Sequence, residues 1–134
     1  MTRPYAVVDT NVVSYLFNRH PLAGAYAQHL QPYHTLISFQ TLAELRYGAL
    51  KDGWGPGRSG RLEALAQSFQ VIYPTDSICT AWATLRVHAR QSGRPIDTAD
   101  AWIAATALAV GCPLVTHNAA DFAGVPGLTV LTEG

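Results

Sequence analysis

Apolar residues occur along the chain in two patterns: short continuous runs, and longer segments with apolar positions at helical spacing. The short runs predict buried strands at 5–9, 34–39, 70–73, 113–116 and 128–131. The longer segments predict helices at 10–18, 21–30, 40–50, 61–69, 76–91 and 97–110. Because buried strands alternate with helices, we expect an α/β fold, a three-layer α/β/α sandwich with a central parallel sheet.

Two connecting segments lack this periodicity. Residues 51–60 hold four glycines and a proline, which favours a flexible loop, and residues 117–124 favour a loop with a short helical turn. In the helix expected at 76–91, the spacing also groups five residues on one buried face: Ile78, Ala81, Trp82, Leu85 and His88.

The composition is typical of a single globular domain spanning residues 1–134. Of the 134 residues, 49% are apolar and 13% are charged, which excludes a disordered chain. No apolar run reaches the roughly 18 residues of a membrane span, so we expect a soluble, cytoplasmic protein with no membrane partner. Cys79 and Cys112 have no metal-ligand spacing and are interpreted as core thiols in a reducing compartment.

The formal net charge is zero, yet several acidic residues stand beside apolar runs. Asp9 ends the first strand, Glu44 lies within a helical apolar segment, and Asp100 precedes a run of alanines. Buried carboxylates are costly unless they are paired, neutralised or bound to a metal. If these three acids and Asp121 form one metal-neutralised cluster, five acids remain against nine basic residues, and the rest of the surface is mildly basic.

The predicted fold can bring the four acids together. Asp9 directly follows a strand, Asp121 lies in the loop after the strand at 113–116, and Glu44 and Asp100 fall early in their helices. Ligands of open parallel sheets bind at the carboxyl ends of the strands. Oxygen ligands without His or Cys spacing favour Mg²⁺ or Mn²⁺, which suits phosphodiester substrates.

Each candidate also has an ordinary structural interpretation. Asp9 is a favourable helix N-cap, and Asp97 with Asp100 forms an Asp-x-x-Asp pattern in which Asp97 is preferred as the cap. Asp121 alone is an unremarkable loop acid. Asn11 is expected either to orient a carboxylate or water through its amide or to bond to the backbone of its own turn, and the hydroxyl of Thr116 is expected to reach a metal-bound water or an aspartate.

The motifs together resemble the PIN-domain ribonucleases and, within them, the VapC toxins of VapBC toxin–antitoxin modules. They are VDTN at 8–11, TLAELRYG at 41–48, DTADAWIAATA at 97–107 and LVTHN at 114–118, followed by Asp121. Each motif alone is weak, whereas their order and spacing are specific.

This resemblance implies a PIN-like fold and a site made of Asp9, Glu44 and Asp100 as metal-binding carboxylates, with Asp121 as a fourth. Asn11 and Thr116 resemble the supporting polar residues, and the Asp-x-x-Ile-Ala-Ala alignment selects Asp100, which leaves Asp97 as a cap or auxiliary ligand.

The implied activity is a Mg²⁺- or Mn²⁺-dependent endoribonuclease acting as a toxin, with RNA as substrate, a homodimeric state and a VapB-like antitoxin as partner. The alternatives are a PIN-like module that binds RNA or protein without catalysis, and a PIN nuclease of RNA processing outside a toxin pair.

Overall fold

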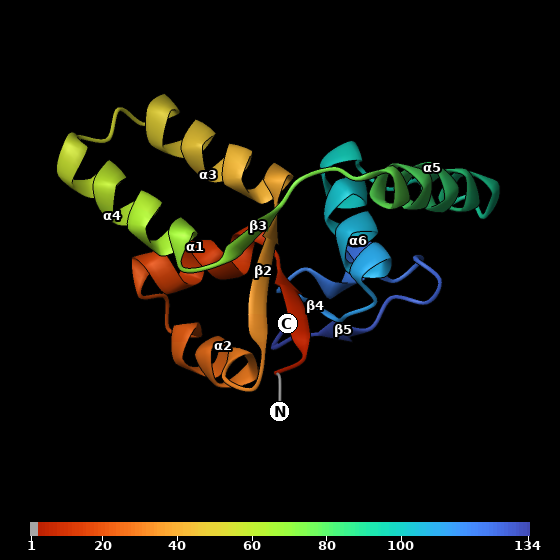
Figure 1. Cartoon of the computed structure of the whole chain (residues 1–134), viewed down its shortest axis with the longest axis horizontal. Coiled ribbons are helices and arrows are strands. Elements are labelled where there is room, and N and C mark those ends of the chain that lie inside the picture. Colours follow the sequence, from red (N-terminus) through yellow and green to blue (C-terminus); the bar gives the residue numbers. More distant parts are fainter. Residues whose placement is uncertain (1–2) are drawn as a thin grey trace.

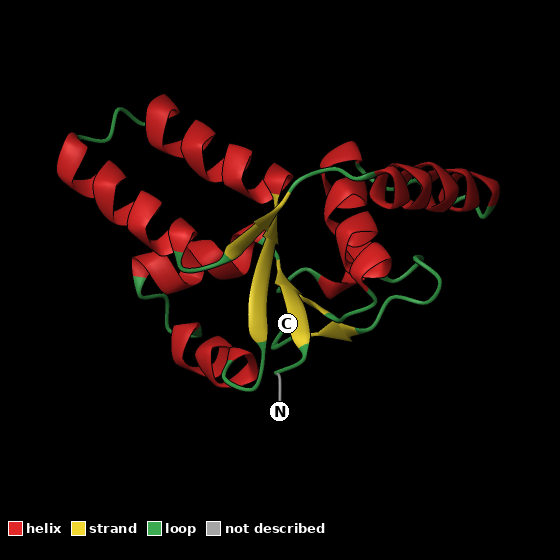
Figure 2. Ribbon diagram, in the orientation of Figure 1, coloured by secondary structure: helices red, strands yellow, loops and turns green. Residues whose placement is uncertain are grey.

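A five-stranded sheet, with all neighbouring strands parallel, forms the centre of the computed structural model, which describes residues 3–134 (Figures 1 and 2). The strand order is β3-β2-β1-β4-β5. The strands are β1 (Tyr5–Val8), β2 (His34–Ser38), β3 (Gln70–Ile72), β4 (Leu114–Val115) and β5 (Val130–Leu131). Because β1 continues to β2 on one side and pairs with β4 on the other, the direction of winding reverses between β1 and β4.

Six α-helices cover the two faces of this sheet. They are α1 (Thr10–Asn18), α2 (Ala23–Leu30), α3 (Phe39–Lys51), α4 (Pro56–Gln67), α5 (Asp76–Gln91) and α6 (Thr98–Val110). A 3₁₀ helix, η1 (Ala119–Phe122), lies between β4 and β5. Figure 1 shows α1 to α4 on one side of the strands and α5 with α6 on the other. The predicted three-layer α/β/α arrangement is therefore confirmed.

Successive residues of the central strands serve two separate cores. Val7 and Leu114 pack in the cluster that includes residues of α5 and α6. Val8 and Val115 pack in the cluster that includes residues of α1 to α4. Since successive side chains of a strand point to opposite faces, these strands are buried on both sides, which explains their continuous apolar runs.

The prediction of a loop at 51–60 is wrong for residues 56–60, which are helical. Helix α4 begins at Pro56 and includes Gly57 and Gly60, with Gly55 at the N-cap. Proline is favourable in the first helical turn because its missing N–H would have no partner there. The glycines that indicated a loop are tolerated because the apolar face of α4 is buried. Leu62 and Ala66 on this face pack in the core cluster that also includes residues of α1 to α3.

Two predictions of burial are also wrong. His88 is exposed and Ala89 takes the buried position on α5. Cys79 is exposed beside the buried Ile78, so only Cys112, which is half-buried, fits the interpretation as a core thiol. None of the helices within residues 3–134 is long and apolar enough to cross a membrane.

Candidate active site

Asp9 lies at the carboxyl end of β1, where the winding of the sheet reverses. Its backbone N–H donates to the carbonyl of Val115 at 2.9 Å, which continues the β1–β4 pairing. Its side chain caps α1 by accepting a hydrogen bond from the Thr10 N–H at 2.8 Å. Only 5% of Asp9 is exposed. This is the crevice in which open parallel sheets bind ligands.

Thr116 and Asn11 hold the second oxygen of the Asp9 carboxylate. The Thr116 hydroxyl donates to Asp9 Oδ2 at 2.6 Å, and Asn11 Nδ2 lies 3.4 Å from the same oxygen. Asn11 Oδ1 also accepts from the His117 N–H at 3.2 Å, and the Asn118 N–H donates to Thr116 Oγ1 at 3.1 Å. The predicted supporting role of both residues therefore takes the form of a bonded frame around Asp9.

Glu44 lies in the second turn of α3 and is half-buried. The hydroxyl of Thr10 is 3.1 Å from Glu44 Oε1 and 3.0 Å from Thr41 Oγ1. Thr10 therefore connects the start of α1 with α3, between Asp9 and Glu44. This role of Thr10 was not predicted from the sequence, although its place directly after Asp9 could have indicated it.

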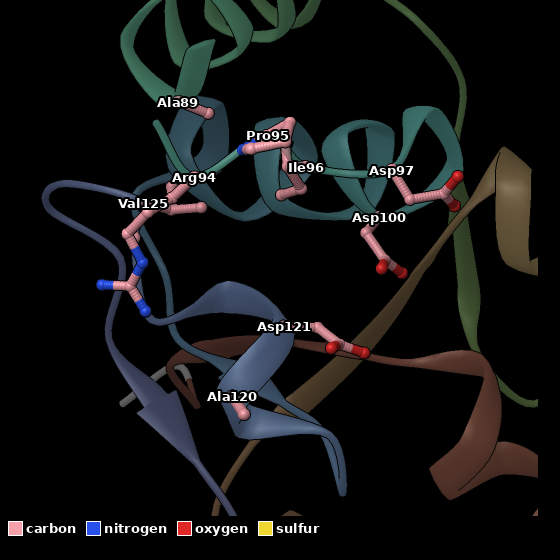
Figure 3. A pocket seen from close by; sticks show the side chains of 10 residues that line it. Ala89, Arg94, Pro95, Ile96, Asp97, Asp100, Ala120, Asp121 and Val125 are labelled. Atoms are coloured by element: carbon pink, nitrogen blue, oxygen red, sulfur yellow. The ribbon is translucent and has the colours of Figure 1, made fainter. Parts of the chain in front are cut away.

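Asp97, Asp100 and Asp121 line one pocket with a volume of about 490 Å³. Figure 3 shows the carboxylates of Asp100 and Asp121 pointing into the space between α6 and η1. Asp97 therefore occupies the predicted cap position, the N-cap of α6, but the side-chain hydrogen bond of a capping residue is not formed.

Burial and repulsion raise the pKa values of three acids at this edge, Asp9, Glu44 and Asp100. Burial is the main cause for Asp9, for which Asp121 adds repulsion, and for Glu44, for which Asp9 and Asp97 add repulsion. The pKa of Asp100 is raised to about 6 by burial and by the charges of the other four acids. Ionising these neighbouring acids together is therefore costly, and a bound cation would lower that cost.

The donor chemistry of the site fits a hard divalent cation. The side chains that meet here offer carboxylate, hydroxyl and amide oxygens, the ligands that Mg²⁺ and Mn²⁺ prefer. Within residues 3–134, no three His, Cys, Asp or Glu side chains already stand at the spacing of a complete metal site. Asp100 and Asp121 line the pocket, and the charges of Asp9 and Glu44 act on Asp100, so a cation would have to draw these acids together.

A buried tyrosine, missed by the sequence analysis, supports the loop after β4. Tyr26 of α2 is fully buried, and its hydroxyl lies 2.7 Å from His117 Nδ1. The same hydroxyl accepts from the Glu133 N–H at 3.0 Å, and the Glu133 carboxylate contacts His29 at 2.6 Å. His117 is thereby engaged with Tyr26, which supports a structural role for this histidine in the loop.

Comparison with known proteins gives a consistent result. The PIN domain family matches residues 6–128. "Ribonuclease VapC1" of Haemophilus influenzae strain R2866 is 32% identical over 91% of this chain and 92% of its own length. "Ribonuclease VapC5" of Mycobacterium tuberculosis is 35% identical over 94% of this chain and 92% of its own length.

Solved structures agree with these sequence relatives. The structure of VapBC-1 from nontypeable Haemophilus influenzae superposes with a TM-score of 0.81 and 31% identity, and covers 96% of this chain and 97% of the matched chain. The structure of VapBC2 from Rickettsia felis, bound to a promoter DNA fragment, superposes with a TM-score of 0.86 and 26% identity over 97% and 99% of the two chains.

Proposed function

Because the chain belongs to the PIN-domain family and, within it, to the VapC ribonucleases, we propose that it is the toxin of a toxin–antitoxin module and an endoribonuclease. One observation carries the assignment of the site. Four acids from separate segments come close together near the reversal point of the sheet, because the charges of Asp9, Glu44 and Asp121 all raise the pKa of Asp100. That arrangement suits hydrolysis of a phosphodiester bond with Mg²⁺ or Mn²⁺.

Asp9, Glu44 and Asp100 are the proposed metal-binding carboxylates, and Asp121 is the fourth. A bound divalent cation would neutralise the attacked phosphate and promote ionisation of the attacking water. Thr116 and Asn11 keep one Asp9 oxygen fixed by hydrogen bonds, so the carboxylate is oriented before substrate binds. Without a cation, these acids would repel an RNA phosphate.

The proposed macromolecular partners are an RNA substrate and a VapB-like antitoxin. The structural relatives from Haemophilus influenzae and Rickettsia felis are VapBC assemblies, and the latter is bound to promoter DNA. We extend this by proposing that the chain works in the cytoplasm as a homodimer within such a complex.

The test is cleavage of a labelled RNA panel, including tRNA, by the purified full chain freed of any partner. We expect cleavage with Mg²⁺ or Mn²⁺, none with EDTA, and none by Asp100→Asn in either metal. Asp76→Asn is the matched control, since Asp76 is an exposed acid at the start of α5, and it should cleave normally. If the wild type neither cleaves RNA nor binds metal by calorimetry, the chain is a non-catalytic binding module.

A further inference from the structure

A depression of about 570 Å³ lies between the end of α1 and the start of α4. Three of its lining residues are the exposed arginines Arg19, Arg58 and Arg61. Arg19 is the C-cap of α1, and the other two lie in the first half of α4. Two helices that are distant in the sequence therefore contribute positive charge to one hollow surface.

The three guanidinium groups are not neutralised by acidic side chains. The ion pairs within residues 3–134 join Arg46 to Glu63, Lys51 to Asp52, and His29 to Glu133. None of them involves an arginine of the depression. Uncompensated arginines on one surface are available to an anionic ligand.

Arg58 is ordered by an aromatic stack. Its guanidinium carbon lies 3.7 Å from the centroid of the Trp54 ring. Trp54 in turn stacks on Phe17 of α1, with ring centroids 5.4 Å apart and an interplanar angle of 13°. A stacked guanidinium keeps its in-plane N–H donors for a ligand, and less conformational entropy is lost when it binds.

This basic depression continues toward the carboxylates. A second depression of about 200 Å³ shares Phe17 and Asn18 with the first and is lined by Thr10 and Glu44 at its other end. Asp52 also lines this connection, beside Lys51. The arginines therefore lie on the α1–α4 side of the proposed catalytic crevice, in a depression adjacent to the one that Glu44 lines.

We propose that Arg19, Arg58 and Arg61 bind backbone phosphates of the RNA strand beside the bond that is cleaved. The proposal rests on the proposed ribonuclease function. The acidic crevice repels the polyanion, so cations outside the crevice are needed to hold the flanking nucleotides. Contacts to phosphates raise affinity for any sequence without selecting one, and they make binding dependent on salt.

The test compares binding of a short fluorescein-labelled single-stranded RNA of mixed sequence by full-length proteins that carry Asp100→Asn to prevent cleavage. In this background, Arg19→Gln, Arg58→Gln and Arg61→Gln are made singly and together. Arg3→Gln is the matched control, because Arg3 precedes β1 and so lies at the amino end of this strand, away from the acids at its carboxyl end. Anisotropy gives Kd as a function of salt, and thermal melting verifies that each variant is folded.

We expect the triple variant to bind about tenfold or more weakly near 0.1 M salt, and its slope of log affinity against log salt to fall by about 2. Each single variant should lower the slope by about 0.7, and Arg3→Gln should change neither quantity. With an intact Asp100, the triple variant should raise KM for RNA and leave kcat within about twofold, since the arginines act on binding rather than on the bond cleaved.

Unchanged RNA affinity and salt slope in the triple variant would overturn the proposal. It would also be overturned if the triple variant kept its RNA affinity but lost binding to a protein encoded beside this chain, because the arginines would then serve that protein. Wild-type cleavage of RNA separates the two levels. If the wild type cleaves but the arginines do not affect RNA binding, only the proposed phosphate path fails. If the wild type does not cleave RNA, the proposed function itself fails.

Discussion

The two halves of the crevice differ in how firmly they are built. On the β1 side, Asp9 is buried and both its carboxylate oxygens accept hydrogen bonds, chiefly from Thr10 and Thr116. On the α6 side, Asp97 and Asp121 are exposed and Asp100 is half-buried, and no hydrogen bond to these three carboxylates occurs within residues 3–134. The carboxylate on the β1 side is held in place by hydrogen bonds within the protein. The carboxylates on the α6 side have no such bonds, so their positions depend on what binds in the pocket.

This difference indicates a division of work. The sheet orients Asp9 before any ligand arrives, because its position follows from the pairing of β1 with β4 and from the capping of α1. The α6 side keeps repelling charges near one another, at a cost that a bound cation would remove.

The largest effect is expected for Asp9→Asn. Asparagine still caps a helix, so the fold should be retained, whereas the loss of the charge removes several kcal/mol of metal-assisted stabilisation. We expect kcat to fall by about a thousandfold or more, measured with labelled RNA under single-turnover conditions. Unaltered cleavage by a folded Asp9→Asn protein would refute the role of this carboxylate.

A smaller loss is expected for Thr116→Val, which removes the donor to Asp9 Oδ2 and keeps the shape of the side chain. A hydrogen bond to a charged group contributes about 1.5–3 kcal/mol, so kcat should fall by about tenfold to a hundredfold. Thr116→Ser retains the hydroxyl and should restore most of the activity. Wild-type activity in the Val variant would show that the Thr116 hydroxyl does not support catalysis.

The acids on the α6 side should make the folding stability of the metal-free protein depend on pH. The pKa of Asp100 is about 6 in the folded protein, above its ordinary value of 3.8, so the folded state binds this proton more tightly than the unfolded chain. The stabilising contribution of Asp100 to the free energy of unfolding should therefore be fully present below about pH 4 and be lost as the pH rises through 6. The raised pKa values of Asp9 and Glu44 act in the same direction.

Thermal melting in EDTA between pH 5 and 8 measures this effect. The wild type should lose several degrees in Tm as the pH rises, and Asp100→Asn should lose less because it has no such proton to release. Addition of Mg²⁺ at pH 8 should raise the Tm of the wild type more than that of Asp100→Asn. A wild-type Tm that rises with pH over this range would contradict the repulsion described for the acids on the α6 side.

The smallest effect is expected for Asp97→Asn. Asp97 is exposed, and asparagine is an equally good residue at the N-cap of α6. Cleavage should stay within about threefold of the wild type, since Asp100 and Asp121 remain in the pocket and exposed charges are screened. Loss of activity as large as that of Asp100→Asn would instead make Asp97 a required ligand.

The sequence alone determined the layers and most element boundaries. The helices 10–18 and 76–91 were predicted with the bounds of α1 and α5, because capping residues and helical spacing are local signals. The parallel sheet followed from apolar runs buried on two faces, and the ends of these runs placed Asp9 and Thr116 at one edge. The four acids were indicated by their places beside apolar runs and after strands, and the family motifs agree with that selection.

Only the tertiary structure decided which side chains meet across that edge. The bonds of Thr10 to Glu44 and of Tyr26 to His117 join residues 34 and 91 positions apart, and no local pattern encodes such pairs. Asp97 occupies the cap position without the capping bond, and it lines one pocket together with Asp121 of η1. Periodicity reports burial along one element, whereas a site depends on distances between elements, which exist only after the sheet has brought them together.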